Sequence, residues 1–215
     1  MELIGIERSR IVSLFLLSNP VAQPPIARLA EALVERYQFS LFPREMADLL
    51  KDKTEFGQGI FEGHRIDSVE VFTDGVVVTA RSNSEVVDRF INDMREWAKS
   101  EFGLLPVETH TINKVYESHL IVSSKKNILD SLGRLSKISA SIQILLKKSS
   151  GIDVELQPSG LSFAADDTKI AGLRPIDFRL ERKVNSSFEK GVYYSRSPLQ
   201  TNDHLRVLEM IESLS

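Results

Sequence analysis

The strongest local signal in the sequence is a tight turn between two apolar runs. Residues 68–72 alternate polar and apolar side chains, Asp74 and Gly75 follow, and residues 76–80 continue as a β-branched run. An Asp-Gly pair favours a hairpin turn, because glycine adopts positive φ without a Cβ clash. This stretch therefore predicts two paired antiparallel strands, and the fold must contain a sheet that accommodates them.

A helix is expected directly after this hairpin. Ser82, Asn83 and Ser84 are residue types that cap a helix, and Gly103 is well placed to end it. Apolar residues recur between them at helical spacing, at Val86, Val87, Phe90, Ile91, Met94, Trp97 and Ala98. We therefore expect the hairpin and this helix to pack as one unit, with Trp97 largely buried.

The remaining elements are predicted from the same kinds of pattern. Strands are expected at residues 11–17, 115–124, 177–184 and 191–195, a second hairpin at residues 152–165, and helices at residues 26–37, 127–148 and after Thr201, Asn202 or Asp203. In the helix predicted for residues 127–148, one face carries Ile128, Leu132, Leu135, Ile138, Ile142 and Leu145.

These elements predict an α+β fold, with helices packed on one face of antiparallel sheet. The first half, residues 1–106, has the βαββαβ order of a ferredoxin-like fold. The second half, residues 107–215, has the order αβββα and roughly repeats the scheme from the strand at Val115. Because no linker rich in Pro, Gly or Ser separates the halves, we expect them to be tightly docked or to form one continuous domain.

Composition excludes several classes of function. The chain has 215 residues, a net charge of −3 and no cysteine, so disulfides, thiolate metal sites and a cysteine nucleophile are excluded. The negative net charge disfavours nucleic acid as the main partner without excluding it. No apolar run is long enough to span a bilayer and no secretory signal is present. We expect a cytoplasmic protein that does not bind membranes.

Three clustered glycines raise the question of a phosphate-binding loop. Gly57, Gly59 and Gly63 stand one residue off the dinucleotide-binding spacing. A phosphate loop needs a helix immediately after it, whose free N–H groups hold the anion. The residues that follow, 64–72, are strand-like instead. We therefore interpret this region as a long loop entering the hairpin, pinned to the core by Phe56, Ile60 and Phe61.

No catalytic or metal-binding motif is visible. The histidines, His64, His110, His119 and His204, lie outside any ligand spacing, and no G-x-S-x-G motif occurs. The Asp166-Asp167 pair lacks a third oxygen ligand that the sequence can locate. We expect no cofactor, no metal and no catalytic residue that the sequence alone identifies.

The best local candidate for a ligand site joins a predicted strand to the longest predicted helix. Its residues are Ser123, Ser124, Lys125, Lys126 and Asn127. Lysines oppose the positive end of a helix dipole, so their presence at a helix N-terminus breaks a local rule and can mark function. Hydroxyls, ammonium groups and free N–H groups together suit an anion. The alternative is that both lysines simply point into water.

Surplus apolar residues on two helices suggest an interface. Ile144 lies opposite the main stripe of its helix, and Val207 and Met210 extend the stripe of the last helix, which includes Ile211. A helix that is apolar on more than one side is deeply buried or contacts a partner. Burial within the same chain is the competing interpretation.

Three classes of function therefore remain open. The leading one is a non-catalytic interaction or assembly subunit, whose partner is another protein or a second copy. The alternative is a regulatory or binding module for an anionic ligand or nucleic acid, acting through Lys125 and Lys126. The third is an enzyme whose site forms only in three dimensions.

Overall fold

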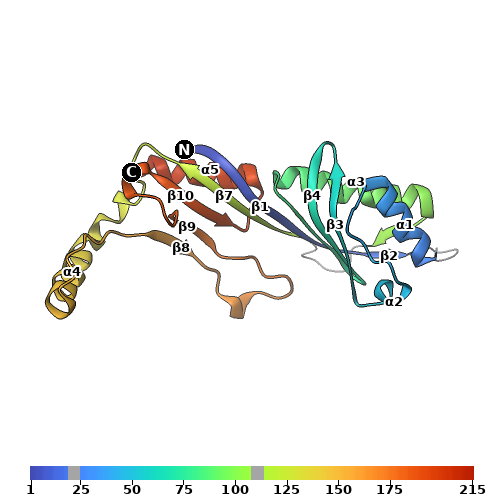
Figure 1. Ribbon diagram of the computed structural model, residues 1–215, viewed down its shortest axis with the longest axis horizontal. Helices are drawn as coiled ribbons and strands as arrows, with labels where there is room; N and C mark the ends of the chain where they lie inside the picture. The colour runs from blue at the N-terminus through green and yellow to red at the C-terminus, as the bar shows by residue number, and fades with distance from the viewer. Residues whose placement is uncertain (19–24, 108–113) are drawn as a thin grey trace.

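The molecule is built around an eight-stranded antiparallel sheet (Figure 1). The computed structural model describes residues 1–18, 25–107 and 114–215. Its strands are β1 (Glu2–Leu14), β2 (Leu16–Ser18), β3 (Lys53–Phe61), β4 (His64–Phe72), β5 (Gly75–Ala80), β6 (Leu105–Val107), β7 (Lys114–Ser123), β8 (Gly160–Phe163), β9 (Phe178–Arg182) and β10 (Val192–Ser197). Its helices are α1 (Ile26–Tyr37), α2 (Met46–Leu49), α3 (Ser84–Phe102), α4 (Ser136–Ser150) and α5 (Thr201–Ser213), with short 3₁₀ turns η1 (Asp130–Leu135), η2 (Asp167–Lys169) and η3 (Phe188–Lys190).

The strand order is the same when the sheet is followed inward from either edge. The order β3-β4-β5-β1 in the first half is matched by β8-β9-β10-β7 in the second, and β1 and β7 pair at the centre. Helices also flank the three-strand meander in both halves. In the first half α1 and the short α2 precede it and α3 follows it, and in the second half α4 precedes it and α5 follows it. The mixed α+β class is confirmed, and the two halves share one topology.

The ferredoxin-like order of the first half is not confirmed. A split βαβ sandwich requires helical crossovers between its strands. Here β3, β4 and β5 follow one another as a meander, and β1 joins the free side of β5. The strand expected at residues 115–124 is β7, which pairs with β1 at the centre of the sheet. The short β6, which was not expected, pairs with β2 in a separate two-stranded sheet.

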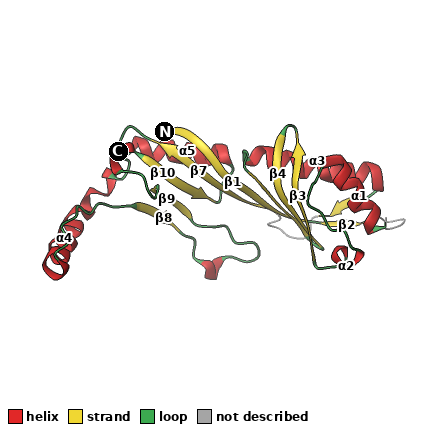
Figure 2. Ribbon diagram, viewed as in Figure 1, coloured by secondary structure: helices red, strands yellow, loops and turns green. Residues whose placement is uncertain are grey.

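The helices α1, α3 and α5 lie over the sheet, whereas α4 projects away from it (Figure 2), and the buried apolar residues form two hydrophobic cores. In the first core α1 and α3 meet over the sheet, with the Tyr37 and Phe90 ring centroids 4.7 Å apart. Trp97 lies in this core and is only 8% exposed, as the apolar stripe of its helix predicts. The second core packs Leu208 of α5 against Leu120, Leu180 and other apolar residues. Strand β1 contributes to both cores, through Ile11 and Ile6.

The glycine-rich region is a strand and not a loop, so this expectation is wrong. Residues Lys53–Phe61 form β3, which pairs with β4 along its length. Gly59 is required because a Cβ there would lie 2.4 Å from the Phe39 ring. Phe56 and Phe61 do pack on the core, whereas Ile60 is exposed. The need for a glycine at position 59 is thus explained by the close approach of the Phe39 ring and not by phosphate binding.

Two expectations in the second half are also wrong. Residues 152–157 form no strand, and β8 pairs with β9 instead of closing a local hairpin. The helix expected from residue 127 begins at Ser136. The adjacent residues Ile128 and Leu129 are both buried in the second core, so this stretch bends back toward the sheet before α4 begins.

Candidate functional site

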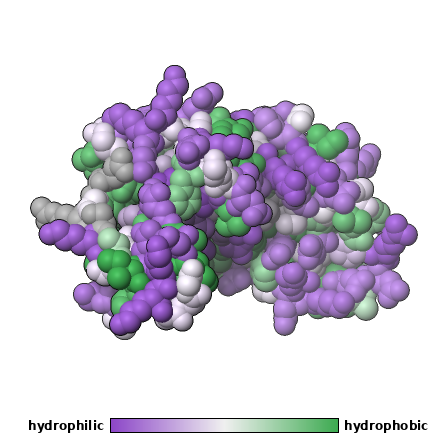
Figure 3. All heavy atoms as spheres, turned by 60° about the vertical axis from the view of Figure 1, so that its left-hand side comes forward, coloured by the Kyte–Doolittle hydropathy of each residue, from purple (hydrophilic) through white to green (hydrophobic). Residues whose placement is uncertain are grey.

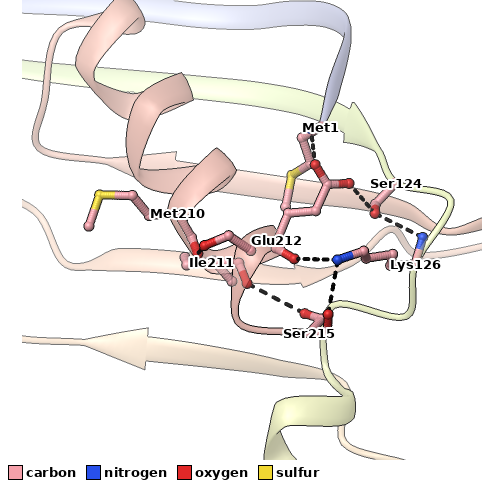
Figure 4. Close-up of polar contacts among 8 residues, drawn as sticks. Met1, Ser124, Lys126, Met210, Ile211, Glu212 and Ser215 are labelled. Carbon is pink, nitrogen blue, oxygen red and sulfur yellow. Dashed lines mark hydrogen bonds and ion pairs between the residues drawn. The ribbon is translucent and has the colours of Figure 1, made fainter.

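In the segment Ser123–Asn127, Ser124 and Lys126 lie close to Met1 and to the C-terminal end of α5 (Figure 4). The segment bends away from the end of β7 and is tied to β10, because the Ser124 N–H donates to the Gly191 carbonyl oxygen over 2.9 Å. The predicted site residues are thus brought together, although no α-helix begins at Asn127. The helix-dipole argument for an anion at this position is therefore wrong.

Lys126 instead stabilises the end of a different helix. Its Nζ donates to the backbone carbonyl oxygens of Glu212 and Ser215, over 3.4 and 3.0 Å. Its backbone N–H donates to Ser124 Oγ over 3.1 Å. A cation at the C-terminus of a helix interacts favourably with the dipole. Lys126, which was expected to oppose the dipole of a helix that begins at Asn127, therefore interacts favourably with the dipole of α5 at its C-terminus.

Glu212 connects the three segments that meet here. Its carboxylate accepts a hydrogen bond from Ser124 Oγ and forms an ion pair with the amino group of Met1 (Figure 4). Hydrogen bonds from that ammonium group and from Ser124 lower the pKa of Glu212 below its usual value. No sequence pattern links Met1, Ser124 and Glu212, because they belong to three elements that only the sheet brings together.

The polar residues at this end border a hollow. Ser124, Lys125, Lys126 and Asn127 line a cavity of about 280 Å³ together with Gln157, Arg182, Phe188, Glu189, Gly191 and Tyr193. Arg182 lies on the same face of β9 as Leu180, and both are buried. A strand was expected at residues 177–184, but the sequence pattern does not show that this face is the core face, so the burial of the Arg182 guanidinium is a finding of the structure.

The predicted interface residues do not form one surface. Met210 is 66% exposed, while Val207 and Ile211 are partly buried against the second core. Met210 and Ile211 lie on α5 close to the Ser124 bend (Figure 4). Ile144 is 67% exposed but lies on α4, which stands off the sheet (Figure 1).

Two histidines take part in polar networks with different surroundings. His119 Nε2 lies 2.6 Å from Glu117 Oε1, and its Nδ1 contacts the Tyr194 hydroxyl. Hydrogen bonds from His119 and Arg8 outweigh burial and lower the pKa of Glu117 to about 2. A carboxylate, an imidazole and a phenol in a row can relay a proton, but none of these three residues lines the hollow at Lys125 and Arg182. His110 lies outside the described residues.

His204 is fully buried between two serines. Its Nδ1 lies 2.7 Å from Ser118 Oγ and its Nε2 lies 2.8 Å from Ser195 Oγ. Because Ser195 Oγ donates to the Arg179 carbonyl oxygen over 2.7 Å, it accepts from Nε2–H. Burial lowers the pKa of His204 to about 4. The imidazole is therefore a neutral structural group that joins α5 to the sheet.

No family model matches this chain, and no curated protein is similar enough to count as a match. Among the described residues, no three histidine, aspartate or glutamate side chains gather as metal ligands. In the described ranges, no helix is both long and apolar enough to cross a membrane.

Proposed function

We propose that this protein is a non-catalytic assembly module that binds a second copy of itself through α4. The proposal rests on one observation. The apolar face that the sequence predicts for the helix at residues 127–148 is exposed along α4 instead of being buried. The exposed members of this face are Leu135, which directly precedes α4, and Ile138, Ile142 and Leu145 within it, and Ile144 on the opposite side is exposed as well. Burying one such side chain contributes about 1.5–3 kcal/mol, so a partner that covers α4 gains a substantial free energy.

The position of α4 supports a docking role. In the first half α1 packs on the sheet and buries Leu33 and Tyr37. Helix α4 holds the corresponding place in the chain order of the second half, but it extends away from the sheet (Figure 1). Apolar side chains also form separate patches on an otherwise hydrophilic surface (Figure 3). An extended apolar helix is suited to lie in a groove of another molecule.

The charges of α4 define the chemistry of its partner. Lys137, Lys147 and Lys148 lie on this helix, and residues 136–150 include no acidic residue. Lys147 forms an ion pair with Asp153 beyond the end of the helix over 2.6 Å, so Lys137 and Lys148 carry most of its free positive charge. Two α4 helices packed against each other bring like charges together, which is unfavourable. A groove with an apolar floor and acidic edges is the complementary surface.

Such a groove lies at the opposite end of the same molecule. Between α1 and α2 a hollow of about 550 Å³ has an apolar lining that includes Ala30, Val34 and Phe56, and its lining acids are Glu31, Glu35 and Glu45, with Arg44 as the basic residue. Two of its lining residues, Phe42 and Met46, are exposed apolar side chains. The groove therefore matches α4 in both hydrophobicity and charge.

The two surfaces differ, so the contact is of the head-to-tail type. Repetition of a head-to-tail contact gives a closed ring or an open chain of molecules. The proposal thus predicts that each surface can be disabled separately and that the two defects complement each other.

The test uses two variants that each retain one surface. The helix variant carries Ile142→Glu and Leu145→Glu, and the groove variant carries Phe42→Glu and Met46→Glu. We expect wild type to self-associate in sedimentation velocity and each variant to be monomeric, because a buried unpaired charge is costly. An equimolar mixture should form a 1:1 dimer and stop, since only one intact helix and one intact groove can meet.

A matched control separates these effects from a general loss of solubility or fold. Val184→Glu changes a side chain that is 80% exposed and lies outside both surfaces, so it should assemble as wild type does. A monomeric wild type contradicts self-assembly. Association of wild type without complementation in the mixture contradicts the helix-in-groove contact and favours a symmetric interface.

A further inference from the structure

Arg182 is a buried cation that has no carboxylate partner among the described residues. The residue is 9% exposed. Its Nη1 donates to the Phe188 carbonyl oxygen over 3.2 Å, and its Nη2 donates to Asn127 Oδ1 and Gln157 Oε1 over 2.8 and 3.2 Å. Its Nε is buried and has no hydrogen-bond partner. Every acceptor that it contacts is therefore neutral.

This arrangement leaves a positive charge uncompensated away from bulk water. Burying a charge is costly unless an opposite charge or well-placed acceptors compensate it. The guanidinium carbon lies 4.2 Å from the centroid of the Phe188 ring, and a cation–π contact offsets part of that cost. The ring and the amide oxygens hold the guanidinium in place, but they do not neutralise it.

The hollow that Arg182 borders is positive as a whole. Lys125 and Lys126 line the same cavity of about 280 Å³, and Glu189 is the one acidic residue in that lining. Lys126 donates to backbone oxygens of Glu212 and Ser215. Lys125 is exposed and has no ion pair with a described residue. The lining of this hollow thus has three basic side chains and one acidic side chain.

We propose that this hollow binds a small polyanion that carries phosphate groups. A guanidinium held in a fixed orientation suits phosphate oxygens, and ammonium groups on flexible stems add charge at the entrance. The site is independent of the contact between α4 and the groove, because it uses Arg182 and Lys125 at the end of the sheet. Its elements, the β7–η1 bend, β9 and the turn before β10, come from distant parts of the sequence.

The test is isothermal titration calorimetry with inorganic pyrophosphate at low ionic strength. We expect binding to wild type and a loss of affinity of about tenfold or more in Arg182→Gln, because one charge-assisted hydrogen bond is worth more than a factor of ten. Lys125→Ala removes an exposed cation, so it should weaken binding while leaving the melting temperature unchanged. Lys99→Ala, an exposed lysine on α3, is the matched control and should bind as wild type does.

Lys125→Ala keeps the test decisive if Arg182→Gln does not fold. Absence of pyrophosphate binding to wild type overturns the proposal. The proposal is also overturned if Lys125→Ala binds pyrophosphate as tightly as wild type, because the anion is then held elsewhere. It is overturned as well if Lys99→Ala weakens binding as much as Lys125→Ala does, because net charge alone then explains the binding. Repeating the titration with sulfate and with a nucleoside monophosphate identifies whether the phosphate group itself is recognised.

Discussion

At the scale of single residues, buried polar groups distinguish this protein more than its apolar core does. Ser9, Ser118 and Ser197 stand opposite one another on β1, β7 and β10, and all are buried. His204 hydrogen-bonds to Ser118 within this row. The buried hydroxyls of Ser9 and Ser197 have no hydrogen-bond partner among the described residues, so in this row the bond between Ser118 and His204 is the one that fixes how α5 meets the sheet.

The stability of the protein should fall as the pH falls through the range set by His204. Its pKa is about 4 in the folded protein, below the ordinary value of about 6.5. As the pH falls, the unfolded chain therefore binds a proton at this histidine before the folded protein does. The stability that neutral His204 contributes is fully present above the ordinary histidine pKa, and it is lost as the pH falls toward about 4. We expect a loss of about 2 kcal/mol between about pH 7 and about pH 5, measured by urea denaturation.

The control for this prediction is His204→Gln, which should be less stable at neutral pH but should lose less between the same two pH values. The lowered pKa of Glu117, about 2, affects stability only below the ordinary glutamate value, as pH falls toward 2. Equal pH dependence in wild type and His204→Gln contradicts the assignment to His204.

Trp97 gives the second prediction at this scale. It lies edge-on to Tyr37 and Phe102, with ring centroids 6.2 and 5.4 Å away. Trp97→Ala leaves a cavity beneath α3, and such changes cost about 3–5 kcal/mol. Denaturation followed by far-UV circular dichroism measures the loss. A cost below about 1 kcal/mol is inconsistent with a packed core position.

At the scale of elements, the helices α3 and α5 begin side by side, and each supplies a side-chain acceptor to a backbone N–H at the start of the other. The Ser84 N–H donates to Thr201 Oγ1 over 3.0 Å, and the Thr201 N–H donates to Ser84 Oγ over 2.7 Å. The first N–H groups of a helix lack partners within the helix. Here each helix receives an acceptor from the other, although neither hydroxyl caps its own helix.

Removing either hydroxyl should therefore weaken both helix starts. Ser84→Ala and Thr201→Val are each expected to cost about 0.5–2 kcal/mol, the range for a lost N-terminal cap. A double-mutant cycle should give a coupling energy of about 0.5 kcal/mol or more, because the two residues interact directly. Strictly additive losses would show that the two hydroxyls act independently.

At the scale of the whole molecule, the central strand makes the two halves interdependent. Strand β1 pairs with β5 on one side and with β7 on the other, and it supplies residues to both cores. The structure thus favours one cooperative unit over two independent domains, although two cores are present.

Unfolding of the two halves should therefore coincide. Leu208→Ala truncates a fully buried residue of the second core and should cost about 2–5 kcal/mol. The single tryptophan, Trp97, reports on the first core. We expect its fluorescence transition to shift with the circular dichroism transition, as two-state unfolding requires. A fluorescence midpoint unchanged by Leu208→Ala would indicate independently folding halves.

The sequence by itself determined the elements whose signals are local. The turn at Asp74, the stripe of α3 with its end at Gly103, and the strand expected at residues 177–184, which is β9, all formed as predicted. In each case the physical cause lies within a few residues, as turn chemistry, helical period or strand alternation. The class of the fold followed from the same patterns.

Only the tertiary structure decided where these elements meet and what the candidate site contains. Strand pairing made β3 out of a glycine-rich stretch, and packing of Ile128 and Leu129 delayed the start of α4. The role of Lys126 and the burial of Arg182 depend on α5, β7 and β9 lying together. Such long-range contacts depend on residues far apart in the sequence, so no local pattern encodes them.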